Sequence, residues 1–176
     1  MALIVQNNSG TVLGANSYVS LDDAINYFVD RQVEFDDDEK LETALIEATT
    51  YIDVTFGSRF WGAKIAEEQE TEWPRVNAFS DIGYDYSGII HFRLMRACYE
   101  YAKIFYDTNE LFPSPTYDDS SQLIKSKTTK VPGAVESSVT YHDSGKKLDT
   151  RKYPKADGLL SPLMSRQSNV TFFRRA

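Results

Sequence analysis

The stretch SGIIHFRLMRACYEYAKIFYD, residues 87–107, is the best candidate for the centre of the protein core. Apolar side chains recur along it three and four residues apart, which places them on one face of a helix. Arg96 and Glu100 fall outside that face, at a spacing that favours an ion pair along the helix. We therefore predict a central helix here. Its apolar face consists of Ile90, Leu94, Ala97, Tyr101, Ile104 and Phe105.

Two further helices are expected on the N-terminal side of the central helix. Residues 36–56 begin with a run of acidic side chains, which the helix dipole favours in a first turn. Gly57 is expected to end that helix. A shorter helix follows Ser20, a good N-cap residue with Asp23 three positions on, as in a capping box. The apolar stripe of the longer helix is Leu41, Ala44, Leu45, Ala48, Tyr51, Ile52 and Thr55.

Residues 59–83 interrupt the helical periodicity and contain both tryptophans of the chain. Trp61 precedes Gly62 and Trp73 precedes Pro74, so each tryptophan stands beside a helix-breaking residue. A loop of this length inside a domain is usually functional or held in place by packing. Three interpretations compete: a packed structural loop, a platform on which bases stack, and a surface that meets another protein.

We favour the packed loop among these three interpretations. Trp61 and Trp73 are then expected to hold the loop against the second and third helices. Arg59 and Arg75 are expected either to stack on the indole rings, where a cation is attracted to the aromatic face, or to contact a neighbouring subunit. Base stacking is the second interpretation.

The pattern changes beyond residue 111. Residues 112–122 are rich in Pro, Ser and Asp, which is typical of a linker. Two strands are expected next, LIKSKTTKV and VESSVTYHD, with Pro132 and Gly133 at the turn between them. KADGLLSPLMS has the pattern of a short helix, and the basic, aromatic end of the chain is expected to be flexible.

These elements predict a mainly α protein: a small helical bundle with an extended β-hairpin arm and a C-terminal tail. Four regions are expected. They are a helical bundle domain with the tryptophan-containing loop (1–111), a linker (112–122), a β arm with a short C-terminal helix (123–164) and a flexible docking tail (165–176).

The composition excludes several classes of protein. The 176 residues suffice for one domain with arms, and 41% hydrophobic residues can form a core. A net charge of −7 argues against bulk attraction to nucleic acid or anionic membranes. No apolar run is long enough for a transmembrane helix, and no signal peptide is expected at the start. The single cysteine, Cys98, excludes an internal disulfide and is expected to be buried and unreactive.

The charge is distributed unevenly along the chain. Residues 1–122 carry 22 acidic and 8 basic side chains, a net charge of −14. Residues 123–176 carry 4 acidic and 11 basic side chains, a net charge of +7. Two explanations of this asymmetry are about equally good. One is chance together with a requirement for solubility. The other is a head-to-tail contact between copies, in which acidic and basic faces meet and close a ring.

No residue pattern indicates an enzyme. His91 and His142 are far apart in the sequence, and phosphate loops, nucleophile elbows and calcium-loop spacings are absent. The acidic runs at 36–39 and 67–72 are expected to be solvated. We therefore predict a non-enzymatic protein without a cofactor or a bound metal.

Single-stranded DNA binding needs aromatic rings that stack on bases and cations that contact phosphates. The tryptophan-containing loop supplies both in Arg59, Phe60, Trp61, Lys64, Trp73 and Arg75. Four glutamates between the tryptophans would, however, repel phosphate. A more basic region interleaves only Tyr141 and Tyr153 with its cations. These cations are Lys125, Lys127, Lys130, Lys146, Lys147, Arg151, Lys152 and Lys155.

Several segments also occur in an order that resembles a known family. They are MALIVQNNSG, ANSYVSLDDAINYF, ATTYIDVTFGSRFWGAK, WPR, FRLMRACYEYAK, KVPGAVESSVTY and RKYPKADGLLSPLM. Over residues 1–164 the chain resembles the head–tail connector (adaptor, head-completion) family of tailed bacteriophages, whose members often carry the label DnaT-like single-stranded DNA-binding protein. One departure is His91-Phe92, where that family usually has Ile-Pro at the start of its third helix.

The resemblance implies a structural subunit in the neck of a virion, present in the host cytoplasm during assembly. Copies would form a dodecameric ring below the portal. The ring would extend the channel for packaged double-stranded DNA without binding it specifically, and it would dock the tail or the next connector. An acidic channel lets DNA slide, because phosphate attraction is what makes DNA binding tight. The channel-facing candidates are Asp36, Asp37, Asp38 and Glu39.

Residues that bind the portal or a neighbouring subunit are also expected. The tail from Ser165 to Ala176 extends past the point where many relatives stop, so its role is not inherited from the family. The phenylalanine pair near the C-terminus is expected to insert into such a partner, because a monomer would otherwise expose it. The alternative function is that of a single-stranded DNA-binding protein of phage replication. The partner-binding candidates are Arg59, Trp61, Trp73, Arg75, Lys125, Lys127, Lys130, Phe172, Phe173, Arg174 and Arg175.

Overall fold

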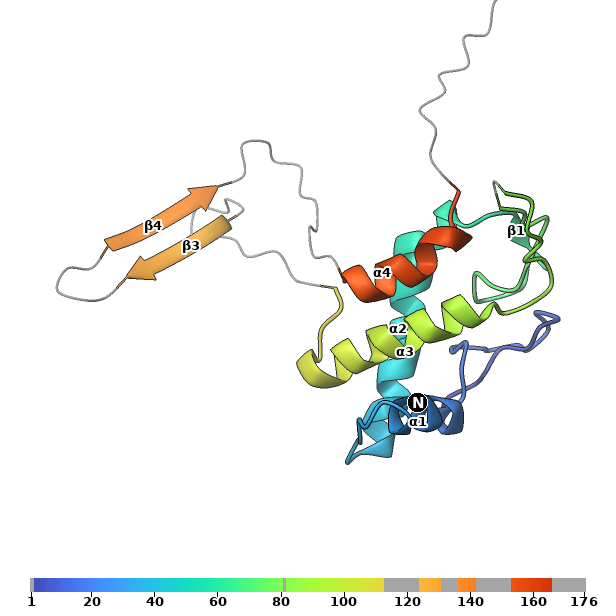
Figure 1. Cartoon of the computed structure of the whole chain (residues 1–176), viewed down its shortest axis with the longest axis horizontal. Coiled ribbons are helices and arrows are strands. Elements are labelled where there is room, and N and C mark those ends of the chain that lie inside the picture. The colour runs from blue at the N-terminus through green and yellow to red at the C-terminus, as the bar shows by residue number, and fades with distance from the viewer. Residues whose placement is uncertain (1, 81, 113–123, 131–135, 142–152, 166–176) are drawn as a thin grey trace, which may run out of the picture. The chain divides into compact units, whose positions relative to one another are not determined.

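Helices make up most of the regular structure in the residues that this computed structural model describes, so the chain is mainly α, as predicted (Figure 1). The described residues are 2–80, 82–112, 124–130, 136–141 and 153–165, and in 124–130 and 136–141 the description is confined to the backbone. The chain divides into two units. One combines Met1–Leu111 with Tyr153–Ala176, and the other is Phe112–Lys152.

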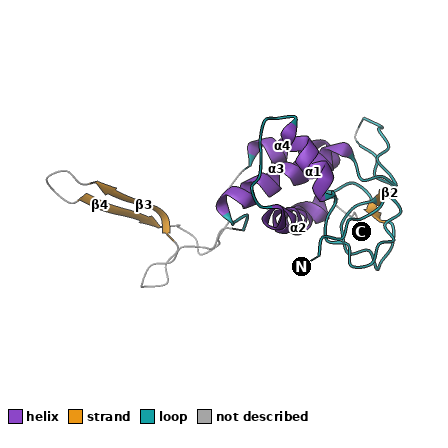
Figure 2. Cartoon of the chain, turned by 90° about the horizontal axis from the view of Figure 1, so that it is seen from below, coloured by secondary structure: helices purple, strands orange, loops and turns teal. Residues whose placement is uncertain are grey.

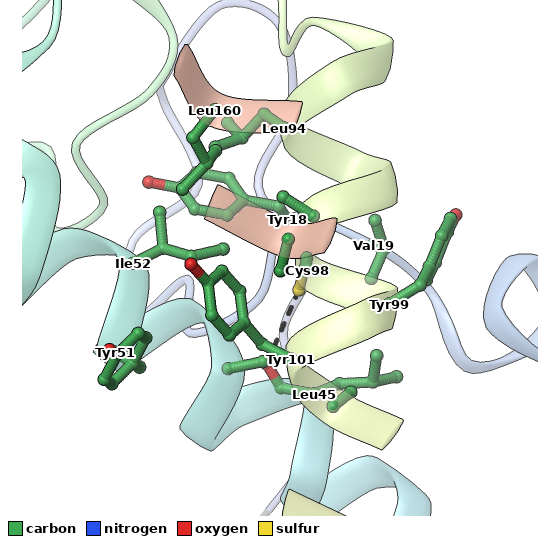
Figure 3. Close-up of a cluster of buried hydrophobic side chains, with 14 of the residues drawn as sticks. Tyr18, Val19, Leu45, Tyr51, Ile52, Leu94, Cys98, Tyr99, Tyr101 and Leu160 are labelled. Carbon is green, nitrogen blue, oxygen red and sulfur yellow. Dashed lines mark hydrogen bonds between the residues drawn. The ribbon is translucent and has the colours of Figure 1, made fainter. Parts of the chain in front are cut away.

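The core of the first unit lies between α2 (Asp38–Phe56) and α3 (Phe92–Thr108), which pack against each other. The predicted stripe of α2 is buried from Leu41 to Ile52, whereas Thr55 is exposed. Cys98 on α3 is buried, and its thiol lies 3.8 Å from the carbonyl oxygen of Leu45 (Figure 3). Burial raises the pKa of this thiol to about 12, so it is unreactive, as predicted.

The capping residues explain where α1 and α2 begin. Helix α1 (Leu21–Val29) follows Ser20, whose hydroxyl accepts a hydrogen bond from the amide of Asp23 at 3.1 Å, which confirms the predicted N-cap. Helix α2 follows Asp37, whose carboxylate accepts from the amide of Lys40 at 2.9 Å. Gly57 follows α2 in right-handed backbone conformation, and the 3-10 turn η1 (Gly57–Arg59) continues the chain from it.

Helix α3 begins five residues later than the sequence pattern predicts. Its N-cap is His91, whose Nδ1 accepts a hydrogen bond from the amide of Arg93 at 3.2 Å. Gly88 has a φ of +71° and donates its amide to the carbonyl oxygen of Arg75 at 2.8 Å, so the preceding residues follow a loop. The apolar residues Ile89 and Ile90 fit the helical pattern, but the backbone does not form a helical turn there.

Helix α4 (Pro154–Leu160) and the turn η2 (Ser161–Leu163) pack on α3 and belong to the first unit. The sequence predicted the short helix but grouped it with the β arm. Lys155 forms an ion pair with Glu100 at 2.6 Å, and Tyr27 donates its hydroxyl to the same carboxylate at 2.7 Å. Glu100 thus joins α1, α3 and α4, in place of the predicted pair with Arg96.

The second unit contains the predicted β-hairpin. Strands β3 (Ile124–Lys130) and β4 (Glu136–Tyr141) are antiparallel, with Lys127 opposite Val139 and Lys130 opposite Glu136. The register shifts between Ile124 and Ser126. The expected turn at Pro132 and Gly133, most of the expected linker and the tail beyond residue 165 lie outside the described residues.

Candidate nucleic-acid interface

The tryptophan-containing loop is packed onto the helices, as expected, but its two tryptophans differ. Trp73 has no exposed surface, its ring meets that of Phe60 edge-on at 5.7 Å, and its amide donates to the hydroxyl of Tyr18 at 3.2 Å. The peptide bond between Trp73 and Pro74 is cis. Trp61 is partly buried against the core. Trp73 therefore holds the loop and has no surface on which a base could stack.

Arg75 lies inside this loop and does not stack on an indole ring. Its guanidinium donates to the carbonyl oxygens of Trp61 and Gly62, each at 2.9 Å, and to the carboxylate of Glu72 at 2.6 Å. It also lies on the short two-stranded ladder of β1 (Ala63–Lys64) and β2 (Arg75–Val76). A Cβ atom at Gly62 would lie 2.1 Å from the carbonyl oxygen of Val76, so this position requires glycine. Arg59 lies over the ring of Phe56 instead of an indole.

Asp53 connects α2 to the same loop. Its carboxylate accepts hydrogen bonds from the hydroxyl of Tyr18 and from the amide of Glu72. Burial raises the pKa of Asp53 to about 7, an effect larger than the lowering by these hydrogen bonds. The Asp53 carboxyl therefore responds to pH near neutrality.

A hairpin formed by residues 78–86 follows the packed part of the loop. The amide of Tyr86 donates to the carbonyl oxygen of Ala78, and that of Ser80 to the carbonyl oxygen of Tyr84, both at 2.9 Å. Figure 2 shows that the loops between α2 and α3 gather at one end of the helices. Three large side chains of this 78–86 hairpin are exposed: Phe79 (49%), Ile82 (78%) and Tyr84 (61%).

Four aromatic rings form a continuous run from the 78–86 hairpin to the start of α3. The centroids of Tyr84 and Tyr86 are 6.5 Å apart, those of Tyr86 and His91 are 4.8 Å apart, and those of His91 and Phe92 are 4.4 Å apart. Phe92 is 51% exposed at the end of this run. Burial, together with the charge of Arg93, lowers the pKa of His91, which agrees with its neutral role as N-cap acceptor.

Two arginines accompany the exposed ring of Phe92. The guanidinium carbons of Arg93 and Arg96 lie 5.6 Å and 5.2 Å from its centroid. Neither arginine forms an ion pair with a carboxylate in the described part of the chain, whereas Lys64, Arg75, Lys103 and Lys155 all do. We call the set of Tyr84, Tyr86, His91, Phe92, Arg93 and Arg96 the aromatic–arginine face.

The sequence contains this signal in YDYSGIIHFRLMR, residues 84–96, but its part from residue 87 onward has the apolar pattern that predicts a core helix. Sequence reasoning placed the candidate stacking rings at the tryptophans, because these are the largest aromatic side chains. Tertiary structure reverses the assignment, since it buries Trp73 and exposes Tyr84 and Phe92.

The other candidate residues lie elsewhere. Asp37 caps α2, Asp36 accepts a hydrogen bond from the hydroxyl of Tyr106, and Asp38 and Glu39 are exposed in the first turn of α2. Lys125, Lys127 and Lys130 belong to β3, where the side chains are outside the description. Phe172, Phe173, Arg174 and Arg175 lie beyond the described residues.

Within the described ranges no helix is long and apolar enough to span a membrane. The same ranges contain no group of three or more potential metal ligands.

A family model described as "Putative DnaT-like ssDNA binding protein" matches residues 1–176. The chain belongs to this DnaT-like ssDNA-binding family. No curated protein and no solved structure matches the chain.

Membership of the DnaT-like family corrects the expectation of a head–tail connector. The family description names binding to single-stranded DNA and no connector function, so the expected portal and tail partners and the ring that surrounds packaged double-stranded DNA were wrong. The channel-facing role expected for residues 36–39 depended on that ring and stays untested. The expected position in a virion neck was implied by that resemblance alone. The description agrees with the alternative weighed from the residues, single-stranded DNA binding.

Proposed function

We propose that this protein binds single-stranded DNA through the aromatic–arginine face and acts without catalysing a reaction. The observation that carries this proposal is the exposed ring of Phe92 beside two arginines that have no described acidic partner. Bases stack on aromatic rings whatever their identity, and neighbouring cations contact the phosphates. Membership of the DnaT-like family supports the same function.

The shape and charge of this face suit a single strand. A duplex keeps its bases stacked on each other, whereas a single strand can place successive bases on Tyr84 and Phe92. The net charge of −7 opposes strong general attraction to DNA, so the few cations near the rings have to supply the phosphate contacts. Lys125, Lys127 and Lys130 of β3 are candidates for additional phosphate contacts.

The proposal predicts a modest salt dependence. Each phosphate contact to a single strand contributes about −0.7 to the slope of log K against log salt concentration. Arg93 and Arg96 alone would give a slope of about −1.4, and the three β3 lysines would raise its magnitude to about 3.5. Fluorescence anisotropy of a labelled oligothymidylate, titrated at several NaCl concentrations, measures this slope.

Two substitutions test the face directly. Phe92→Ala should weaken binding about tenfold or more, since stacking on one ring contributes about 1–3 kcal/mol per base. Arg96→Ala should weaken binding and reduce the magnitude of the salt slope by about 0.7. Both side chains lie at the surface, so the thermal midpoint should change little.

Matched controls come from the rest of the first unit. Lys40 lies 4.3 Å from the ring of Tyr106, another cation over an aromatic ring. Tyr106 is separated from Phe92 by about 21 Å along α3, at 1.5 Å per residue. Lys40→Ala and Val54→Ala, a 72% exposed aliphatic position, should leave affinity unchanged. If the wild-type protein fails to bind the oligonucleotide even at low salt, the proposal is wrong.

A further inference from the structure

The end of the 78–86 hairpin presents an apolar surface that no described contact covers. Ile82 is 78% exposed, the largest exposed fraction among the large hydrophobic side chains of the described residues. Phe79 and Tyr84 flank it in the same hairpin and are each about half exposed. Turns normally carry Gly, Asn, Asp, Ser or Pro, so an exposed isoleucine beside Gly83 is unusual. Several large apolar side chains exposed in one short hairpin indicate an interaction site.

We call Phe79, Ile82 and Tyr84 the tip of the hairpin. Its surroundings favour bases over phosphates as its ligand. Tyr84 belongs both to the tip and to the aromatic–arginine face, so the two surfaces are continuous. The hairpin also contains Asp85, an exposed acidic residue that opposes phosphate contact at this end. The arginines lie at the other end of the run, beside Phe92. Phosphates and an apolar ligand are thus directed to different parts of one surface.

Apolar side chains such as Ile, Leu and Phe are the type that proteins insert against base steps. Insertion into an intact duplex requires unstacking, which costs a few kcal/mol per step. At a junction between duplex and single strand, the terminal base pair already has one apolar face open to water. An exposed isoleucine can cover that face without breaking a stack, and it gains from removal of apolar surface from water.

We propose that Ile82 packs on the terminal base pair of a single-strand–duplex junction while the aromatic–arginine face holds the adjoining single strand. This inference rests on the proposed single-stranded DNA binding and specifies the DNA structure that is bound most tightly. The 78–86 hairpin then selects the junction, and Phe92, Arg93 and Arg96 supply the binding that plain single strands share.

The test compares three labelled DNAs with the full-length protein: a single strand, a duplex carrying a single-stranded tail of the same length and sequence, and a blunt duplex. The dissociation constant for the tailed duplex should be about five- to tenfold lower than for the single strand, the change expected from removing most of one isoleucine side chain from water. The blunt duplex should bind most weakly, because it offers no strand to the rings.

Ile82→Ser should abolish the preference for the junction and leave the affinity for the plain single strand unchanged. Ile82→Leu should retain the preference. Leu13→Ser is the matched control, since Leu13 is 76% exposed in a different loop. Circular dichroism and the thermal midpoint establish that each variant is folded.

The outcomes separate the two proposals. If the wild-type protein binds the single strand but shows no preference for the tailed duplex, or if Ile82→Ser keeps the preference, this inference is overturned and the proposed function stands. If no oligonucleotide binds, both are overturned. Light scattering tests whether Ile82 instead contacts a second copy of the protein. A concentration-dependent increase in mass that Ile82→Ser removes would assign the end of the hairpin to contact between copies, against the inference.

Discussion

Arg75 in the tryptophan-containing loop and Asp53 on α2 have structural roles that their residue types do not predict. Arg75 was a candidate for stacking or partner contact, yet its side chain is 9% exposed and its donors are directed to backbone carbonyls and to Glu72. Asp53 was not a candidate, yet its carboxylate accepts hydrogen bonds from the hydroxyl of Tyr18 and the backbone amide of Glu72. At both positions a polar side chain forms the hydrogen bonds that backbone groups of the loop, shielded from solvent, cannot form with water.

Arg75→Met should destabilise the protein by about 2–4 kcal/mol, because it removes the buried donor of three carbonyl groups, those of Trp61, Gly62 and Glu72. The Glu72 carboxylate would also lose this partner and keep its ion pair with Lys64. Urea denaturation followed by circular dichroism measures the free energy of unfolding. Arg59→Met, at an exposed arginine over Phe56, is the control and should change stability by less than about 0.5 kcal/mol. Equal effects of the two substitutions would contradict the role assigned to Arg75.

Asp53 should make stability depend on pH. Its pKa is about 7 in the folded protein, above the value of about 4 for an unfolded aspartate. Between these values the folded state binds more protons than the unfolded state, so stability falls as pH rises through this window. Asp53→Asn should flatten the fall in free energy of unfolding between pH 4 and 7 relative to wild type, measured by urea denaturation at each pH. Parallel pH profiles for the two proteins would refute this assignment.

At the scale of elements, helix boundaries depend on contacts that periodicity does not report. The apolar pattern extends the central helix back to residue 87, but the Gly88 amide donates to Arg75 and His91 caps the helix one residue before Phe92. This displacement matters for the proposed function, because it takes His91 out of the helix and leaves it in the run of rings between Tyr86 and Phe92. The same pattern could not show that α4 packs on α3, since a 41-residue unit separates them in the chain.

Packing of α4 on α3 should contribute measurably to stability. Leu160 on α4 has no exposed surface, and Leu160→Ala should lower the free energy of unfolding by about 2–4 kcal/mol through lost burial and a residual cavity. Leu159→Ala provides the matched control, because the neighbouring leucine is only partly buried. Urea denaturation compares the two variants. A loss for Leu160→Ala no larger than that for Leu159→Ala would show that α4 is not part of the cooperative core.

At the scale of the whole molecule, the charge asymmetry follows the two units only in part. Residues 112–152 carry seven basic and five acidic side chains, so most of the negative charge resides in the helical unit. The chain leaves and re-enters that unit at adjacent points, since the hydroxyl of Tyr153 donates to the carbonyl oxygen of Leu111 at 3.3 Å. The helical unit therefore does not need the intervening residues to close its fold.

Replacement of residues 112–152 by a short Gly-Ser linker should leave a folded helical protein with an unchanged cooperative unfolding transition. This variant should still bind a single strand through the aromatic–arginine face, with a salt slope near −1.4 because the β3 lysines are gone. Thermal denaturation and anisotropy titrations measure the two properties. Loss of cooperative unfolding would show that the two units depend on each other for folding.

The resemblance to connectors illustrates which residues carry a sequence likeness. Its most specific segments are the opening residues, the run from Tyr51 to Gly62 and Trp73-Pro74-Arg75. The structure buries Tyr51, Phe60 and Trp73, whereas Arg59 and Gly62 are exposed. Residues of this kind report how a chain packs, whereas function depends on residues placed at the surface of a fold. The connector assignment therefore inferred a function in part from packing residues, and the family match corrected it.

The sequence by itself determined the mainly α class, the N-cap at Ser20, the buried stripe of α2, the β3–β4 hairpin and the buried thiol of Cys98. These features follow from local periodicity, capping and burial, which short stretches of sequence encode. Only the tertiary structure decided which aromatic rings are exposed, where α3 begins and with which helix α4 packs. Those outcomes depend on contacts between residues far apart in the chain, such as Trp73 with Tyr18 and Gly88 with Arg75, and no local pattern encodes them.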